Sequence, residues 1–282
     1  MTLTARDYFA LPASQIDASV EQDFYGSLKM RNGTFKLTAA TRFAEIEAAF
    51  REIFRERAPC IRHALDVGVS TGTTTVELAD FLLRHGSPAK TVATDLYVNA
   101  KLVEPLAGVF VLTDSSGWPL QYEVLGKAVR SWNRRLDYLT LKFIPRALLR
   151  NALAGRVRAS IEAGKFEPVQ MIGRTVHDRD DITVVEDDIL RRSGQLASAF
   201  DFVRAANILN SNYFSAADLD RAIGNIASYL KGPGSMLLVT RTNRARANAG
   251  TLFEYRAGGT FAVLGRVGGG SEIEDMVLRH AG

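Results

Sequence analysis

The sequence has very little of what disulfide frameworks and metal centres need. Its 282 residues include one cysteine, Cys60, which excludes an internal disulfide and a multi-cysteine metal site. The four histidines do not have the spacing of metal ligands, so we expect no bound metal: His63, His85, His177 and His280. A chain without disulfides is typical of a reducing compartment, and we expect a cytoplasmic protein.

Long apolar runs are also missing. No window approaches the roughly 18 continuous apolar residues that a transmembrane helix needs. The N-terminus, "MTLTARDYFALPASQIDASV", lacks the basic start and apolar centre of a signal peptide. We therefore expect neither a membrane span nor a signal peptide.

The composition is that of an ordinary globular protein, with 46% hydrophobic and 23% charged residues. At this length we expect one large domain, or one domain with an insertion. The net charge of +4 is unevenly distributed, because residues 121–160 hold nine basic and two acidic residues. This basic segment is one of the two features that need a functional explanation.

The N-terminal region predicts one helix. Residues 1 to about 38 look irregular, with a short strand near "GTFKL". From Thr38 to Arg57 apolar side chains recur at helical spacing: Phe43, Ile46, Ala49, Phe50 and Ile53. We take 1–58 as an N-terminal region and 59–282 as the main domain.

Short apolar runs alternate with helical patterns between residues 60 and 240. The expected strands are "CIRHALDVGV", "KTVATDL", "DITVVEDDIL", "AFDFVRAANIL" and "SMLLVTR". The helical patterns are "TTTVELADFLLRHG" and "SAADLDRAIGNIASYLKGPG", the second capped by Ser215. This alternation predicts an α/β fold with a doubly wound parallel sheet, and the Gly-rich tail predicts antiparallel strands at one edge.

The turn "LDVGVSTG" is the second feature that needs an explanation. Gly68, Ser70 and Gly72 are small residues at every second position after a buried strand, so a ligand can approach the backbone closely there. The dinucleotide pattern G-x-G-x-x-G is only partly matched, since Ser70 and Thr73 replace two of its glycines. A carboxylate at Asp66 repels a pyrophosphate and attracts a cationic ligand.

The same turn resembles the first motif of class I S-adenosylmethionine-dependent methyltransferases, in the form D-x-G-x-S-x-G. In that family the loop wraps the amino-acid end of the cofactor, whose ammonium and sulfonium suit Asp66. The resemblance implies S-adenosyl-L-methionine as cofactor, held also by Gly68, Ser70 and Gly72. It implies a Rossmann-like seven-stranded sheet with a reversed C-terminal strand, matched here by the tail hairpin.

Further motifs follow in the order that the resemblance implies. Asp95 closes the second strand, where the family accepts hydrogen bonds from the two ribose hydroxyls. Asp188 with Ile189 matches the adenine-binding end of the third strand, with Asp187 as the alternative. Asn207 follows the fourth strand, whose end faces the transferring methyl group.

A finer similarity concerns the fourth strand alone. "VRAANILNSNYF" is similar to the "CRN-x-x-x-YF" region of chemotaxis receptor glutamate methyltransferases. The Cys and the adjacent Arg-Asn pair of that region are missing here, so the substrate of that group is not carried over.

The acceptor side is less defined. The candidates are Arg204, Asn207, Asn210 and Tyr213. "NILN" stands where amine-methylating DNA enzymes have Asn/Asp-Pro-Pro-Tyr/Phe, and Cys60 lies on the wrong side of the turn for carbon-5 cytosine chemistry. These two DNA chemistries are therefore disfavoured, and no RNA-binding signature such as an aromatic RNP strand is present, so we expect no nucleic acid partner. An oxygen, nitrogen or carbon atom of a small molecule or lipid remains as acceptor.

Each candidate also has a purely structural alternative. Asp95 can be a helix N-cap. Arg204 can be a surface salt-bridge residue, and Asn207 and Asn210 can be turn residues. These alternatives stay open at the level of sequence.

About 90 residues separate Asp95 from Asp188, which indicates an insertion at 100–175. It begins with a hairpin around Ser-Ser-Gly and continues as a mainly helical cap. The segment "KAVRSWNRRLDYLTLKF" predicts a first helix with one apolar stripe: Val129, Trp132, Leu136, Leu139 and Phe143. Pro145 starts a second helix, which is basic. The basic segment 121–160 is a solvated cap, a peripheral membrane contact, or a site for nucleic acid or another anionic partner.

These observations predict an S-adenosylmethionine-dependent methyltransferase acting on a small molecule or lipid. A non-catalytic S-adenosylmethionine-binding or interaction protein on the same fold is the first alternative, because methyl transfer needs few obligatory residues. A nicotinamide-dependent oxidoreductase is the second alternative, and Asp66, Ser70 and Thr73 disfavour it.

Overall fold

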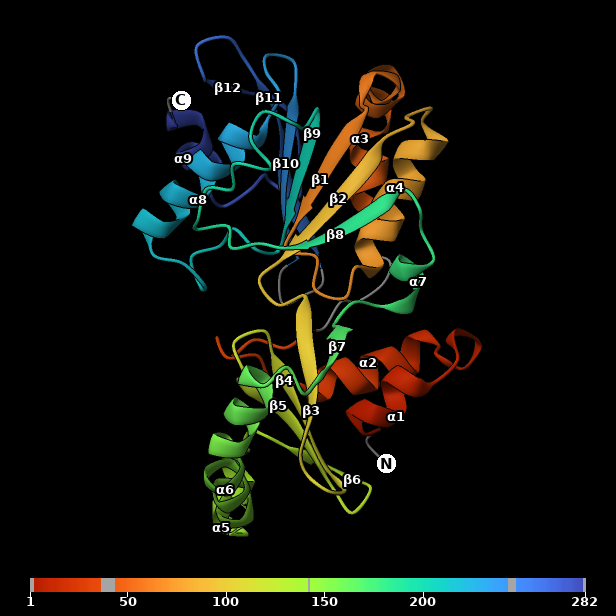
Figure 1. Ribbon diagram of the computed structural model, residues 1–282. Helices are drawn as coiled ribbons and strands as arrows, with labels where there is room; N and C mark the ends of the chain where they lie inside the picture. The colour runs from red at the N-terminus through yellow and green to blue at the C-terminus, as the bar shows by residue number, and fades with distance from the viewer. Residues whose placement is uncertain (1–2, 37–43, 142, 243–246, 281–282) are drawn as a thin grey trace. The chain divides into compact units, whose positions relative to one another are not determined.

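The computed structural model describes residues 3–36, 44–141, 143–242 and 247–280. The chain divides into two compact units (Figure 1). Unit 1 comprises Met1–Thr38 and Tyr97–Arg174, and unit 2 comprises Ala39–Leu96 and Thr175–Gly282. The first 38 residues thus group with the middle segment, a different division from the expected ranges 1–58 and 59–282.

Unit 2 contains a seven-stranded sheet in the order β12-β11-β10-β9-β1-β2-β8. Its parallel strands are β1 (His63–Val67), β2 (Lys90–Asp95), β8 (Ile182–Glu186), β9 (Phe202–Ala206) and β10 (Met236–Thr242). The chain moves outward from β1 to β8 on one side and then crosses to β9 on the other. The expected α/β class and doubly wound order are confirmed.

The last two strands form a meander, which places the reversed strand one position earlier than expected. β11 (Asn248–Tyr255) is antiparallel to β10, and β12 (Phe261–Val267) is antiparallel to β11. The expected reversed strand is therefore present as β11. The final strand runs with the parallel set because a second hairpin returns the chain to its original direction.

Helices cover both faces of this sheet (Figure 1). On one face α3 (Ala44–Arg57) and α4 (Thr73–Arg84) pack Phe50, Phe54 and Phe81 against Phe202. The expected helix from Thr38 is seen from Ala44 onward, and Thr38–Phe43 lie outside the described residues.

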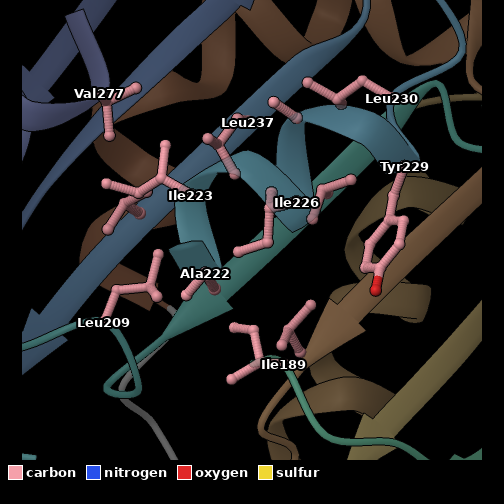
Figure 2. Packing of buried hydrophobic residues seen from close by; sticks show 14 of the residues in the cluster. Ile189, Leu209, Ala222, Ile223, Ile226, Tyr229, Leu230, Leu237 and Val277 are labelled. Carbon is pink, nitrogen blue, oxygen red and sulfur yellow. The ribbon is translucent and has the colours of Figure 1, made fainter. Parts of the chain in front are cut away.

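The other face is covered by α8 (Ala216–Tyr229) and α9 (Glu274–Arg279). Figure 2 shows Ile223 and Ile226 of α8 packed near Leu237 of β10. Ser215 caps α8 as expected, since its Oγ accepts the N–H of Asp218 at 3.2 Å.

Alternation along the strands decides which side chains meet which helices. Leu65, Val67 and Val203 face the α8 side, and Ala64 and Phe202 face the α3 and α4 side. By the same alternation, Asp66 and Arg204 lie on the α4 side of β1 and β9. An acid and a base are thus placed side by side within a buried sheet.

Unit 1 corrects the expectation of a mainly helical insertion, because it contains a five-stranded antiparallel sheet in the order β6-β5-β4-β3-β7. The strands are β3 (Asn99–Leu106), β4 (Val109–Asp114), β5 (Pro119–Val124), β6 (Lys127–Arg130) and β7 (Glu167–Gln170). The expected hairpin around Ser-Ser-Gly is confirmed as β4–β5. The helices of its middle segment are α5 (Arg135–Leu139) and α6 (Phe143–Glu162), and α7 (Arg174–His177) follows.

The long helix predicted over Lys127–Phe143 is wrong. Lys127–Arg130 pairs with β5 as the edge strand β6, and the helix α5 begins only at Arg135. Val129 and Trp132 had helical spacing with Leu136, but backbone pairing with β5 overrides that local pattern. The expectation of an irregular N-terminal lead-in is also wrong.

The lead-in contains α1 (Ala5–Ala10) and α2 (Ala18–Ser27), which cover one face of the unit 1 sheet. Tyr8, Phe24 and Tyr25 are buried there, with the Tyr8 and Phe24 rings stacked 3.9 Å apart. α6 packs on the other face through Leu153 and Val157 (Figure 1). None of the described helices combines the length and apolarity needed to cross a membrane.

Candidate functional site

The carboxyl ends of four parallel strands meet at one edge of unit 2. Val67 of β1 is in register with Thr94 of β2 and Ala205 of β9, and Asp95 with Glu186 of β8. The order of the strands reverses between β1 and β9. In open α/β sheets a crevice at this point is where ligands bind.

The turn from Gly68 to Gly72 is held close to the end of β2 by its own amides. Gly68, Ser70 and Gly72 have φ of +77°, +57° and +84°. A Cβ on Gly68 would lie 2.7 Å from Ile208 Cδ1, so this position needs glycine. The bonds are Gly68 N–H to Thr94 O (2.8 Å), Val69 N–H to Thr94 O (3.1 Å), Ser70 N–H to Asp95 Oδ2 (2.8 Å) and Gly72 N–H to Val69 O (2.8 Å).

These bonds bear on the choice of ligand. A phosphate-binding loop presents its backbone N–H groups to the ligand. Here the N–H groups of Gly68, Val69, Ser70 and Gly72 donate to the protein itself. These four amides of the turn are therefore not available to a pyrophosphate.

Asp66 lies beneath this turn in a buried ion pair. Arg204 Nε donates to Asp66 Oδ1 at 2.8 Å and Arg204 Nη2 to Asp66 Oδ2 at 2.5 Å. Thr75 Oγ1 donates to the same carboxylate at 2.6 Å. The exposed fractions of Asp66 and Arg204 are 1% and 2%.

This pair corrects the electrostatic argument made from sequence. Because the guanidinium neutralises the Asp66 carboxylate, Asp66 does not present an uncompensated negative charge to an approaching ligand. The occupied amides of the turn, and not the charge of Asp66, now argue against a pyrophosphate. The structural alternative for Arg204 was a salt bridge at the surface. The structure shows a salt bridge, but a buried one.

Asp95 is the carboxylate that lies at the edge itself. It is half-buried at the end of β2, and its Oδ2 accepts the Ser70 amide. Its backbone carbonyl accepts the N–H of Asp187 at 3.0 Å. Asp95 thus joins the turn after β1 to the segment after β8.

The segment after β8 places its three predicted residues differently. Burial raises the pKa of Asp187, and the neighbouring Asp188 charge raises it further. Asp188 Oδ1 accepts the N–H of Leu190 at 3.0 Å, and its Oδ2 lies 3.6 Å from Arg191 Nε. Ile189 packs into the core beside α8, as Figure 2 shows. The backbone bond to the Asp95 carbonyl places Asp187 directly beside the end of β2, and the choice between Asp187 and Asp188 stays a prediction.

The acceptor-side asparagines build the loop after β9. Asn207 has φ +62°, and its Oδ1 accepts the N–H of Thr242 at 2.7 Å. Asn210 is buried and its Nδ2 donates to Asn207 O at 3.0 Å. Tyr213 is 61% exposed. Of the four acceptor-side candidates, Tyr213 has the side chain most open to solvent.

Sequence reasoning missed Thr74 and Thr75 as partners of the buried pair. Thr75 binds Asp66, and Arg204 Nη2 donates to Thr74 Oγ1 at 3.1 Å. The available signal was a pair of opposite charges, Asp66 and Arg204, at matching positions in two otherwise apolar strands. Their register makes them direct neighbours.

The described residues contain no group of three or more His, Cys, Asp and Glu side chains placed to hold a metal ion. The edge instead offers a close-packed turn, the carboxylates of Asp95 and Asp187, and the exposed Tyr213. A carboxylate at Asp95 fits a vicinal diol, because its two oxygens can each accept a hydroxyl hydrogen bond.

No protein-family model matches the sequence, and no curated protein sequence matches it. Among solved structures, an O-methyltransferase family protein from Burkholderia thailandensis is 15% identical over 87% of this chain and 47% of its own, with a TM-score of 0.33. The amino pentose methyltransferase CalS10 from Micromonospora echinaspora is 13% identical over 79% and 61%, with a TM-score of 0.35. The sugar N-methyltransferase KedS8 from a Streptoalloteichus species is 14% identical over 81% and 73%, with a TM-score of 0.34.

This chain spans less than half the length of several solved structures that it matches. Because the identities and TM-scores are this low, these neighbours do not decide what the chain binds. The site has to be judged by its own geometry.

Proposed function

We propose that the chain is an S-adenosylmethionine-dependent methyltransferase that acts on a small molecule. The observation that carries the proposal is the link between the Asp95 carboxylate and the Ser70 amide at the carboxyl edge of the sheet. It joins Asp95, the residue predicted to bind the ribose, to the turn predicted to bind the amino-acid end of the cofactor. The reversed strand β11 and the occupied turn amides support the same choice over a dinucleotide.

In this proposal unit 2 carries the cofactor. Asp95 binds the ribose hydroxyls, Gly68 to Gly72 packs along the amino-acid end, and Asp187 or Asp188 holds the adenine. When bound, S-adenosylmethionine supplies the reactive methyl group, so the protein mainly binds and orients its ligands. The Asp66–Arg204 pair holds the turn in place from beneath.

A non-catalytic S-adenosylmethionine-binding protein is the second proposal. It is favoured by the side chains of Arg204, Asn207 and Asn210, which are engaged in bonds within unit 2. Release of S-adenosylhomocysteine in the presence of cell extract separates the two proposals, because only an enzyme produces it.

A lipid acceptor with peripheral membrane contact is a narrower form of the first proposal. It is supported by exposed leucines on α5 and α6 beside the basic residues of 121–160: Leu136, Leu139 and Leu148 are 68%, 82% and 64% exposed. Apolar side chains flanked by cations suit an anionic membrane surface. Co-sedimentation with phosphatidylserine vesicles tests this form.

Asp95→Ala tests the cofactor site. We expect the variant to bind S-adenosylmethionine at least tenfold more weakly by calorimetry, because hydrogen bonds to a charged group contribute about 1.5–3 kcal/mol. The wild-type chain should bind S-adenosylmethionine in preference to NAD.

Asp201→Ala is the matched control. Asp201 is also a half-buried carboxylate that accepts backbone amides, those of Arg62 and His63, but it lies at the opposite end of the strands. The control should keep wild-type affinity. Unchanged affinity in Asp95→Ala, or equal loss in both variants, would contradict the site.

A further inference from the structure

A cavity in unit 1 is lined by arginines. It has a volume of about 750 Å³ and lies where the end of α2 meets β5, β6 and the start of α6. Arg130, Arg134 and Arg146 line it, together with the polar side chains of Ser27 and Gln121. We call these three side chains the arginine cluster.

The cluster holds more positive than negative charge. Asp137 is its shared carboxylate: Asp137 Oδ2 accepts Arg146 Nη1 at 2.5 Å and lies 3.6 Å from Arg130 Nη2. The same oxygen accepts the backbone N–H of Arg134 at 2.6 Å. Asp23 is a second carboxylate in the lining and is exposed. Three guanidinium groups therefore face two carboxylates, which leaves an excess of one positive charge.

The Asp137 carboxylate stays ionised in this setting. The hydrogen bond from Arg146, followed by the one from the Arg134 amide, lowers the pKa of Asp137 to about 2. Asp137 is thus fully engaged with the cluster at neutral pH, and the excess charge persists.

Arg130 combines partial burial with an incomplete set of partners. Its Nη1 is shielded from solvent and has no hydrogen-bond partner among the described residues. Burial lowers the pKa of Arg130, and repulsion by Arg134 and Arg146 lowers it further. A guanidinium in this state is unfavourable alone, and an anion in the cavity would relieve both the repulsion and the desolvation.

Trp132 holds the cations in place. The guanidinium carbons of Arg130 and Arg134 lie 4.8 and 5.5 Å from its ring centre, and Lys29 Nζ lies 5.8 Å away. The indole Nε1 donates to Ser27 O at 2.9 Å, which fixes the ring. Cation–π contacts therefore orient Arg130 and Arg134 without neutralising them.

We propose that unit 1 binds the phosphoryl group of a small soluble molecule at the arginine cluster. Planar guanidinium groups match the oxygens of a phosphoryl group in paired hydrogen bonds, and three such groups suit an anion with three oxygens better than a carboxylate. The cavity volume is within the range of small-molecule sites. This inference does not depend on methyl transfer.

A lipid headgroup offers the same phosphoryl chemistry. The recess favours the soluble ligand, because Arg146 is 11% and Arg130 24% exposed at the side chain. A membrane surface would meet exposed cations first. The experiment has an arm for each source.

The test is calorimetry of the full chain with inorganic phosphate and with pyrophosphate, in low salt and without S-adenosylmethionine. We expect one binding site that weakens as salt rises. Arg130→Met should weaken pyrophosphate binding at least tenfold. Arg156→Met, which removes an equal charge from an exposed position on α6, should change it less than twofold.

Arg134→Met is the second variant, because Arg134 is exposed and its substitution spares the fold. We expect it to weaken pyrophosphate binding severalfold. Absence of phosphate and pyrophosphate binding, or wild-type affinity in both variants, would overturn the proposal. Binding to phosphatidylserine vesicles that pyrophosphate does not displace would also overturn it, in favour of a lipid surface. Each result is independent of cofactor binding in unit 2.

Discussion

Two arginines, one in each unit, occupy opposite electrostatic settings. Arg204 in unit 2 is 2% exposed and makes a two-pronged ion pair with Asp66. Arg130 in unit 1 is 24% exposed at its side chain, stacks on Trp132 and lies 3.6 Å from a carboxylate that Arg146 already uses. The more deeply buried arginine is the better compensated one.

The difference separates structural charge from binding charge. A buried ion pair with matched geometry fixes the strands and the turn around it and leaves no field for a ligand. A cation held in position by an aromatic ring, with too few carboxylates near it, keeps its field. Arg204 therefore belongs to the scaffold of unit 2, and Arg130 belongs to a candidate site in unit 1.

Asp66→Ala should break this comparison most strongly. It leaves Arg204 buried without its partner, and we expect the free energy of unfolding of unit 2 to fall by about 3–5 kcal/mol. Both tryptophans, Trp118 and Trp132, lie in unit 1. The urea midpoint measured by far-UV circular dichroism should therefore fall, because this signal includes unit 2. The midpoint measured by tryptophan fluorescence should not change, because that signal reports unit 1.

The double variant Asp66→Leu/Arg204→Met is the control for this reading. It removes both charges together, so it should be more stable than Asp66→Ala. A double variant less stable than the single one would mean that the pair contributes mainly by its net attraction.

Gly68→Ala sharpens the comparison by disturbing the turn above the Asp66–Arg204 pair. The added Cβ meets Ile208 Cδ1 at 2.7 Å. Gly258→Ala has a similar φ of +81° but meets nothing within 4 Å, so it reports the backbone strain alone. We expect Gly68→Ala to be less stable than Gly258→Ala by about 1–3 kcal/mol in thermal or urea unfolding. Equal losses of stability in the two variants would show that the Ile208 side chain moves away from the added Cβ at little cost.

Arg130→Met should have the smallest effect on stability, with the opposite sign. Removing a shielded N–H group that has no acceptor among the described residues stabilises the fold by about 1–3 kcal/mol. Losing the cation–π contact with Trp132 offsets about 0.5–1 kcal/mol or more of this gain. We follow urea unfolding by tryptophan fluorescence. We expect the free energy of unfolding of unit 1 to stay the same or to rise by up to about 1 kcal/mol. A loss above that would place Arg130 with the structural arginines.

Unit 2 was predictable because its signals are local. β1, β2, β9 and β10 are short apolar runs that end at small or polar residues, and α8 shows both its cap and its apolar stripe. The place of the reversed strand was harder to predict. Two hairpins in succession have the same local pattern whichever strand runs backward.

Unit 1 was not predictable in the same way because its elements are defined by distant partners. Tyr8, Phe24 and Tyr25 carry no strong periodicity, and they become a core by packing on β3, β4 and β5. Lys127–Arg130 has helical spacing with the residues after it and is a strand because β5 offers it an edge.

The candidate site was partly predictable. The sequence located Asp95 and the turn, since both follow apolar runs, and the structure links them through Ser70. It gave no indication that Asp66 is neutralised, because the register that pairs it with Arg204 joins residues 138 positions apart. It also could not reveal that Trp132 contacts cations from both sequence segments of unit 1, Lys29 from the first and Arg130 and Arg134 from the second.

The division of unit 1 between two segments has a consequence for synthesis. When a ribosome has made residues 1–174, both segments of unit 1 are complete. Unit 2 then has α3, β1, α4 and β2 but lacks β9, whose Phe202 and Val203 belong to the cores on its two faces. We expect unit 1 to fold before unit 2, whose two cores stay incomplete until β9 has been made.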